Sequence, residues 1–169
     1  MQAIFIDLAN ELQELADEVE MLRLSAAEHE ATKSTLTPQM AWLHIAGLAS
    51  GIEKVYTGCE RIMATIAVQL DKSPISRDQG WHATLLRRMH NAFPGVREAL
   101  LADDTYDALN DLRAFRHRER NSYGLALDSE IVGQRASEAI TAFQLFRRDF
   151  ANLSRTVVGD TYPSSTHTP

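Results

Sequence analysis

Apolar residues recur at helical spacing through most of the chain, and this periodicity constrains the fold more than any other feature of the sequence. Near the N-terminus, successive apolar residues are three or four positions apart: Ile4, Leu8, Leu12, Leu15, Val19 and Leu22. This spacing places them on one face of an α-helix. No segment shows the sustained alternation of apolar and polar residues that a half-buried strand requires. The sequence therefore predicts an all-α fold.

Capping and helix-breaking residues divide the rest of the chain into further helices. Thr37 and Pro38 suit the start of a helix over residues 38–70, because threonine caps a helix and proline fits its first turn. A polar surface loop is expected at 71–80, followed by a short helix at 81–92 and a helical connection. The next helix is one that Asp103 or Asp104 caps and Gly124 ends, and a last helix follows Asp128. Four or five helices with short connections predict an antiparallel bundle over residues 1–158.

The composition fits a single domain that does not cross a membrane. The chain has 169 residues, of which 44% are hydrophobic and 24% are charged, as in an ordinary globular domain. Its apolar runs are far shorter than the roughly 20 residues that span a bilayer, and residues 1–12 lack the basic region of a signal sequence. We therefore expect a cytoplasmic protein, with residues 159–169 as a flexible tail and Cys59 as a small packing residue.

Positive charge is concentrated in residues 113–120. This octet, RAFRHRER, carries a net charge of +3, whereas the whole chain carries -6. Helical spacing places three arginines of this octet along one side of a helix together with Tyr123: Arg113, Arg116 and Arg120. One interpretation is a solvated face whose arginines pair with the acidic first helix. The other is phosphate recognition, because a guanidinium holds two phosphate oxygens and its charge is permanent. The local excess of charge favours phosphate recognition.

The histidines alone do not indicate a catalytic or metal site. His117 and Asn121 are four positions apart on a neighbouring side of the same helix, but a lone histidine is more often a surface or packing residue than a catalyst. His82 and His90 suggest a pair of metal ligands at most. No carboxylate-x-x-histidine pairing of the diiron type accompanies them. The sequence predicts no metal and no cofactor.

Residues 112–128, LRAFRHRERNSYGLALD, resemble the signature segment of HEPN domains of the HepT-like toxin branch. In that segment a helix carries arginine, a polar residue, three variable positions, histidine, one more position and tyrosine. Arg116 matches the arginine and Tyr123 matches the tyrosine. The resemblance extends upstream through Tyr56, Gly58 and Glu60 and through WHATLLRRM at 81–89, and it covers residues 4–153.

The resemblance implies an all-α bundle that dimerises, so that two signature helices border a shared cleft and cleave RNA without a metal. It also implies a partner, an MNT nucleotidyltransferase-like antitoxin. Arg116 would then be the phosphate clamp and catalytic arginine, and Tyr123 would be the tyrosine that the antitoxin adenylylates. The further RNA-binding candidates are Arg113, His117 and Arg120.

One catalytic position departs from the family pattern. Asn121 stands where the family has histidine, and an amide cannot exchange protons near neutral pH. We therefore expect a catalytically impaired chain. Three explanations are open: an introduced inactivating substitution, a natural non-catalytic member of the family, or use of His117 instead. We favour the first, because asparagine is nearly isosteric with part of imidazole. The last is geometrically poor, because neighbours in a helix point about 100° apart.

Two other functions are open at this point. A non-catalytic HEPN module would bind a nucleotide or a partner protein through the arginine cleft, and Asn121 favours it. A structural bundle would use the arginines only to pair with the acidic first helix.

Overall fold

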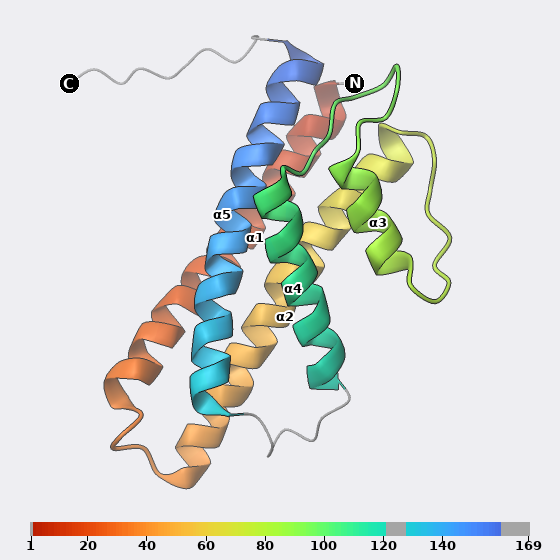
Figure 1. The fold of residues 1–169 in the computed structure, drawn as a ribbon. Coiled ribbons are helices and arrows are strands. Elements are labelled where there is room, and N and C mark those ends of the chain that lie inside the picture. The colour runs from red at the N-terminus through yellow and green to blue at the C-terminus, as the bar shows by residue number, and fades with distance from the viewer. Residues whose placement is uncertain (1, 121–127, 160–169) are drawn as a thin grey trace, which may run out of the picture.

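The computed structural model describes residues 2–120 and 128–159, with the backbone alone at residues 2 and 117–120. Within these ranges the chain forms helices and no strand, so the predicted all-α fold is confirmed (Figure 1). The helices are α1 (Gln2–Thr32), α2 (Pro38–Gln69), α3 (Trp81–His90), α4 (Asp103–Arg120) and α5 (Ser129–Val158). Among the described residues, none of these helices is long and apolar enough to cross a membrane.

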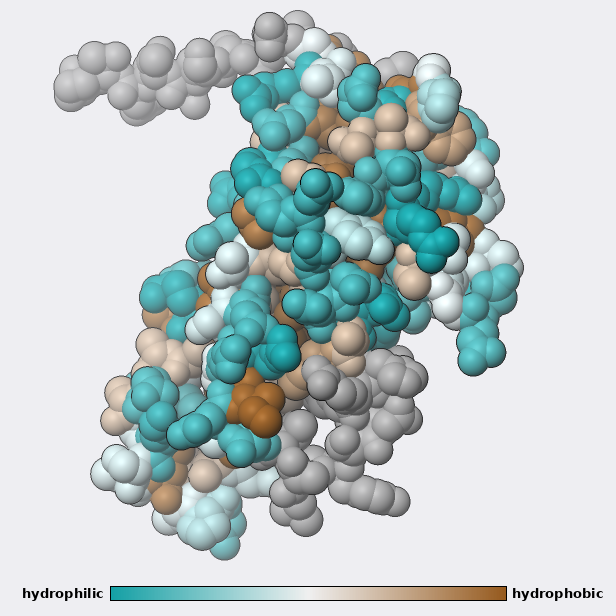
Figure 2. Space-filling model, in the orientation of Figure 1, coloured by the Kyte–Doolittle hydropathy of each residue, from teal (hydrophilic) through white to brown (hydrophobic). Residues whose placement is uncertain are grey.

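The four longer helices run alternately up and down, which is the antiparallel bundle expected from short connections (Figure 1). α1 packs along α2, α5 packs against both, and α4 lies against α5 and α2. The short helix α3 packs on α2 and α4 at one side of the bundle. Figure 2 shows hydrophilic side chains over most of one face, with apolar ones in small separate groups.

The buried stripe of the first helix differs from the predicted one by one position at its start, and that of the last helix begins at Val132 rather than at Ile131. In α1, Ile4 is half-buried and Phe5 is buried, while the rest of the predicted stripe is buried as expected. In α5, Ile131 is 54% exposed and Val132 is buried. Residue 132 lies four positions before the buried Ala136 and so shares its face of the helix, whereas residue 131 does not.

Two glycines of α2 allow α1 to approach closely. A Cβ atom on Gly58 would lie 2.5 Å from Leu15 Cδ1, and one on Gly51 would lie 2.9 Å from Leu22 Cδ1. Both distances are shorter than van der Waals contact, so a side chain at either glycine would push the two helices apart or displace a buried leucine. The close packing that these glycines indicate is therefore present between α1 and α2.

The predicted cap residues are correct for α2 and α5 and wrong for α4. Thr37 and Asp128 each accept hydrogen bonds from backbone N–H groups in the first turn of the helix that follows. Asp103 and Asp104, by contrast, are themselves the first two residues of α4.

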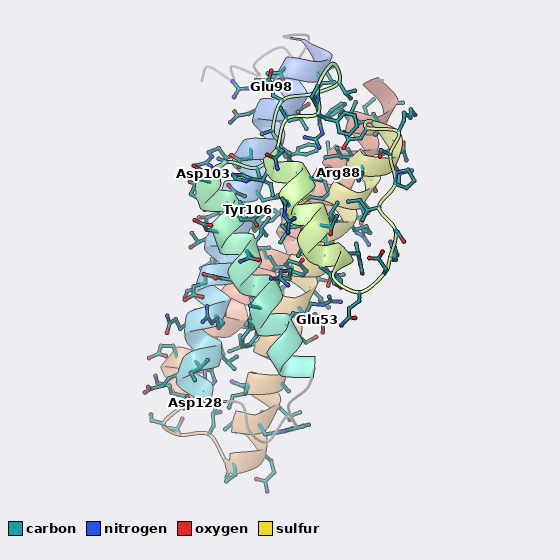
Figure 3. The ribbon with its side chains drawn as sticks, turned by 45° about the vertical axis from the view of Figure 1, so that its right-hand side comes forward. Glu53, Arg88, Glu98, Asp103, Tyr106 and Asp128 are labelled. Atoms are coloured by element: carbon teal, nitrogen blue, oxygen red, sulfur yellow. The ribbon has the colours of Figure 1, made fainter. Side chains whose placement is uncertain are left out.

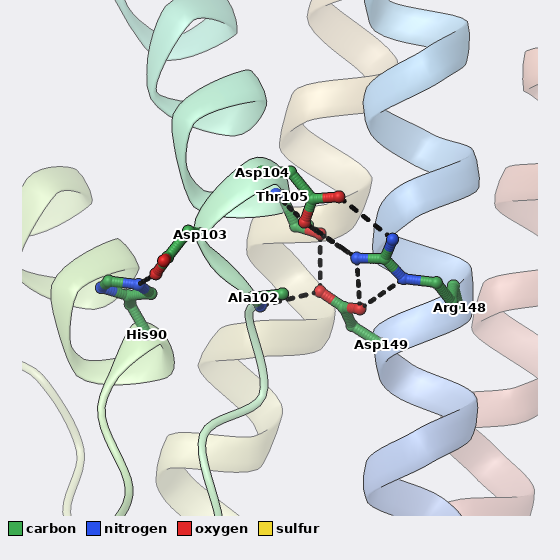
Figure 4. Close-up of polar contacts among 7 residues, drawn as sticks. All are labelled: His90, Ala102, Asp103, Asp104, Thr105, Arg148 and Asp149. Atoms are coloured by element: carbon green, nitrogen blue, oxygen red, sulfur yellow. Dashed lines mark hydrogen bonds and ion pairs between the residues drawn. The ribbon is translucent and has the colours of Figure 1, made fainter.

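A carboxylate from a neighbouring helix holds the start of α4. Asp149 of α5 accepts hydrogen bonds from the Ala102 N–H group at 2.9 Å and from the Thr105 hydroxyl at 2.6 Å (Figure 4). Asp149 is buried. Asp104 also accepts a hydrogen bond from the Thr105 N–H group at 2.8 Å, so the start of α4 has one local acceptor and one that lies more than 40 positions away.

A buried ion pair fixes the segment after α3. Asp71 follows the end of α2, and its side chain and that of Arg97 have no exposed surface. Arg97 Nε donates to Asp71 Oδ1 at 2.7 Å, and Nη2 donates to Oδ2 at 3.0 Å. The same guanidinium donates to the backbone carbonyls of Arg88 at 3.3 Å and Asn91 at 3.2 Å. The pair therefore joins the end of α2 to the end of α3.

The helical connection predicted after α3 is wrong. Phe93 and Arg97 exchange backbone hydrogen bonds of 2.8 and 3.0 Å, which close a turn. The Arg97 side chain points inward to Asp71. Its guanidinium also donates to the Glu98 carbonyl group, which a helix would have used for its own backbone hydrogen bonds. Helical periodicity in the sequence does not predict this long-range ion pair.

We predict that Arg97→Met destabilises the fold strongly, because it leaves the Asp71 carboxylate buried without its partner. The expected loss in the free energy of unfolding is about 3–5 kcal/mol, measured by urea denaturation. The control is the double variant Arg97→Met with Asp71→Leu, which removes both charges and should recover most of that loss. A single variant as stable as the unaltered chain would contradict this account.

Candidate functional site

Arg116 contacts side chains from two other helices. Its Nε donates to Glu53 Oε1 of α2 at 3.2 Å, and its Nη1 lies 3.4 Å from His82 Nε2 of α3. The guanidinium carbon is 5.8 Å from the centre of the Tyr56 ring. The Arg116 side chain is 13% exposed, and Figure 3 shows Glu53 beside the C-terminal part of α4. The predicted catalytic arginine is thus a permanent cation held where α2, α3 and α4 meet.

His82 joins Arg116 to a buried carboxylate. Gly80, with φ at +89°, adopts the left-handed conformation before α3, which places His82 in the first turn of this helix. His82 Nδ1 and Glu60 Oε1 form a short hydrogen bond. The Glu60 side chain is 7% exposed and that of His82 is 28% exposed. His82 therefore lies between Glu60 and Arg116 and is the most exposed of the three side chains.

The contacts of His82 define its tautomer when the ring is neutral. A guanidinium has only donors, so His82 Nε2 must accept the hydrogen bond from Arg116. The ring proton is then on Nδ1, where it donates to the Glu60 carboxylate. This arrangement leaves an unprotonated nitrogen directed at Arg116.

Tyr56 closes the inner side of this cluster. It is completely buried in α2, four residues before Glu60. Burial raises the pKa of the Tyr56 hydroxyl, and the nearby Glu60 carboxylate raises it further. Tyr56 therefore stays neutral at physiological pH and provides an aromatic wall for Arg116 rather than a group that exchanges protons.

A pocket of about 470 Å³ opens beside these residues, and we call it the His82 pocket. Its charged and aromatic lining side chains are Glu60, Arg61, Arg77, Trp81, His82 and Arg116. The Arg77 guanidinium lies 4.9 Å from the centre of the Trp81 ring, and the centres of the Trp81 and His82 rings are 4.1 Å apart. The pocket thus combines three arginines, one tryptophan and an imidazole whose carboxylate partner is buried.

A second pocket of about 470 Å³ lies on the other side of Arg116, toward α1. Its lining carries the carboxylates of Glu14, Glu18 and Glu53. Lys54, a basic residue of this pocket, pairs with Glu18 at 3.0 Å. Carboxylates repel phosphate, so the His82 pocket is the better of the two for an anionic ligand.

The structure describes only some of the side chains that the sequence assigns to this site. Arg113 does not join Arg116: it donates to Asn110 Oδ1 of its own helix at 3.1 and 3.0 Å and lines neither pocket. The backbone of α4 continues through His117 and Arg120, whose side chains lie outside the described residues. Asn121 and Tyr123 also lie outside them.

Sequence reasoning assigns no role to Glu60 and considers His82 only as a metal ligand. No group of three or more histidine, cysteine or acidic side chains that could hold a metal occurs among the described residues. The available signal was Glu60 itself, a charged residue beside the apolar stripe that contains Tyr56, Cys59 and Met63. An acid on the buried face of a helix needs a partner, but the sequence does not say which residue supplies it.

The comparisons with known proteins agree with the resemblance seen in the sequence. A family model described as HepT-like protein matches residues 47–157. This range contains Glu60, His82 and Arg116 and reaches from α2 almost to the end of α5. No curated protein and no solved structure matches the chain. The family match covers more than half of the sequence, and the chain therefore belongs to the HepT-like protein family.

Proposed function

We propose that this chain is the toxin subunit of a HEPN-MNT toxin-antitoxin pair and that its active form is a metal-independent RNA endonuclease. Membership in the HepT-like family suggests a ribonuclease-type module of a toxin-antitoxin system. The observation that carries the proposal is the position of Arg116, which lines a pocket together with an imidazole and the Arg77–Trp81 pair.

The chemistry of RNA cleavage fits this set of side chains. Cleavage without a metal needs a group that takes the proton from a ribose 2′-hydroxyl and a cation that stabilises the charge growing on the phosphate. Arg116 supplies the cation at the wall of the pocket. Trp81 and the guanidinium of Arg77 offer flat surfaces on which an unpaired base can stack. A single-stranded or looped RNA is therefore the substrate class that this pocket favours.

The acidity of the whole chain is compatible with RNA binding at one place. The net charge is -6, which opposes nonspecific contact with a polyanion over the whole surface. In the proposed homodimer two copies of the basic segment 113–120 border one cleft and double the local positive charge. His117, Arg120 and Arg113 are proposed to contact the RNA backbone around the clamp at Arg116.

The proposed partner is an MNT nucleotidyltransferase-like antitoxin that adenylylates Tyr123, three residues beyond the end of α4. Adenylylation adds a bulky anionic group close in sequence to the arginines. An added phosphate would compete with RNA for the same cations. Adenylylation of Tyr123 would therefore inhibit RNA binding both through the negative charge of the added group and through its bulk.

We predict that the Asn121→His variant cleaves RNA in EDTA, because it carries an imidazole at the family's proton-transfer position. Arg116→Ala in the Asn121→His background should lower the rate by about 100-fold. The assay follows labelled tRNA or total RNA on denaturing gels. Arg147→Ala is the matched control, because Arg147 is exposed on α5 and lines neither pocket.

Failure of the histidine form to cleave RNA would contradict the ribonuclease proposal. Binding of a nucleotide that depends on Arg116, without cleavage by either form, would favour the non-catalytic binding module. Asn121 is the observation that supports this second function.

We predict a dimer in solution. Light scattering at micromolar concentration should give a mass about twice the 18.9 kDa of one chain. A monomer would remove the shared cleft, although the pocket within one chain would still be available for the cleavage assay.

A further inference from the structure

We propose that His82, oriented by Glu60, exchanges the proton during RNA cleavage by this chain, in place of an imidazole at position 121. The inference rests on the proposed ribonuclease function and names the residue that performs its proton transfer. Its starting point is a distance: His82 Nε2 lies 3.4 Å from Nη1 of Arg116, the proposed phosphate clamp. The base and the cation are therefore already neighbours within one chain.

His82 has the protonation pattern that a general base requires. Its Nδ1–H donates to Glu60, and its Nε2 carries the lone pair. Taking up a proton at Nε2 makes the ring a cation, which the buried Glu60 carboxylate then stabilises through its hydrogen bond with Nδ1. The His82 side chain is 28% exposed and lines the pocket, so a substrate can reach it.

Glu60 is a costly residue at its position unless it serves His82. It lies in α2 with a side chain that is 7% exposed, next to the buried Cys59. Desolvating a carboxylate opposes folding, and an apolar residue would pack there without that cost. The hydrogen bond that Glu60 makes holds one specific ring nitrogen of a pocket residue. Glu60 is thus a positioning residue that acts through His82.

The ribose 2′-hydroxyl is the donor that suits His82 Nε2. In the described structure, Arg116 Nη1 donates the hydrogen bond that His82 Nε2 accepts. A phosphate in the His82 pocket would draw the guanidinium N–H groups to its own oxygens. The 2′-hydroxyl adjoins the scissile phosphate in RNA, and it takes the place of Arg116 as the donor to Nε2. DNA lacks this hydroxyl and cannot react in this way.

The reaction balances without any further reactant. His82 Nε2 takes the 2′-hydroxyl proton while the 2′-oxygen forms a bond to the adjacent phosphorus. The bond from phosphorus to the 5′-oxygen breaks, and the 5′-oxygen takes a proton from water. The His82 imidazolium then returns its proton to the solvent. The products are a 2′,3′-cyclic phosphate and a 5′-hydroxyl, and Arg116 remains a cation throughout.

We predict that the full chain with Asn121 unchanged cleaves labelled RNA in EDTA and that His82→Gln lowers this rate by about 100-fold. The fragments should carry 2′,3′-cyclic phosphate ends. His90→Gln is the matched control, because His90 lies at the other end of α3, pairs with Asp103 at 2.7 Å and lines neither pocket. Thermal unfolding of each variant checks that it is folded.

A pH profile separates a role in catalysis from a role in stability. The charged groups around His82 are Glu60 and Arg61 of α2, Arg77 of the preceding loop, and Arg116 of α4. Glu60→Gln keeps a hydrogen-bond acceptor but removes the negative charge that stabilises the imidazolium. The base is active when unprotonated, so this substitution should change the pH profile of cleavage and lower the maximal rate. A purely structural Glu60 would leave the midpoint of this profile unchanged.

The outcomes distinguish this inference from the proposed function. Equal cleavage by the unaltered chain and His82→Gln overturns the role of His82 and keeps the ribonuclease. An inactive Asn121 chain beside an active Asn121→His chain likewise overturns the role of His82 and keeps the ribonuclease. Absence of cleavage by both of these chains overturns both proposals.

Discussion

The position of the candidate site depends on the buried ion pair between Arg97 and Asp71. This pair joins the end of α2 to the turn that follows α3, and Arg97 also binds carbonyl groups at the end of α3. Arg88, which is labelled in Figure 3, lies near the end of α3. It reaches the segment just after α2 as well, through its hydrogen bond to Ser73 Oγ at 3.3 Å. With its far end fixed in this way, α3 presents His82 to both Glu60 and Arg116. A shift of α3 would separate the imidazole from its carboxylate.

The described part of the chain buries three carboxylates, and their partners differ in an informative way. Asp71 binds an arginine that is itself fully buried, and Asp149 binds the backbone and a hydroxyl at the start of α4. Both of these contacts connect elements of the bundle. Glu60 instead binds His82, whose other nitrogen faces Arg116 in an open pocket. This difference is the physical reason for assigning the first two to the fold and the third to the proposed reactive site.

The sequence predicts features that depend on neighbouring positions and misses those that depend on contacts between distant segments. Helical periodicity and local caps were enough for the all-α bundle and for the starts of α2 and α5 at Thr37 and Asp128. The start of α4 and the turn at Arg97 depend on Asp149 and Asp71, which are far away in the sequence. The same limit applies to the site. Arg116 follows from the signature segment, whereas the His82–Glu60 contact spans 22 positions and appears only when α2 and α3 are packed.

The central claim is that RNA binds in the His82 pocket with its phosphate on Arg116, and fluorescence of Trp81 tests it most directly. The chain has two tryptophans, so Trp42→Phe leaves Trp81 as the only one. Titration with a 2′-O-methyl oligoribonucleotide, which lacks the free hydroxyl needed for cleavage, should quench this fluorescence in a saturable way that weakens with added salt. Arg116→Ala should lower the affinity by about tenfold or more. Fluorescence that RNA leaves unchanged, or quenching that is equal without Arg116, would contradict this account of the site.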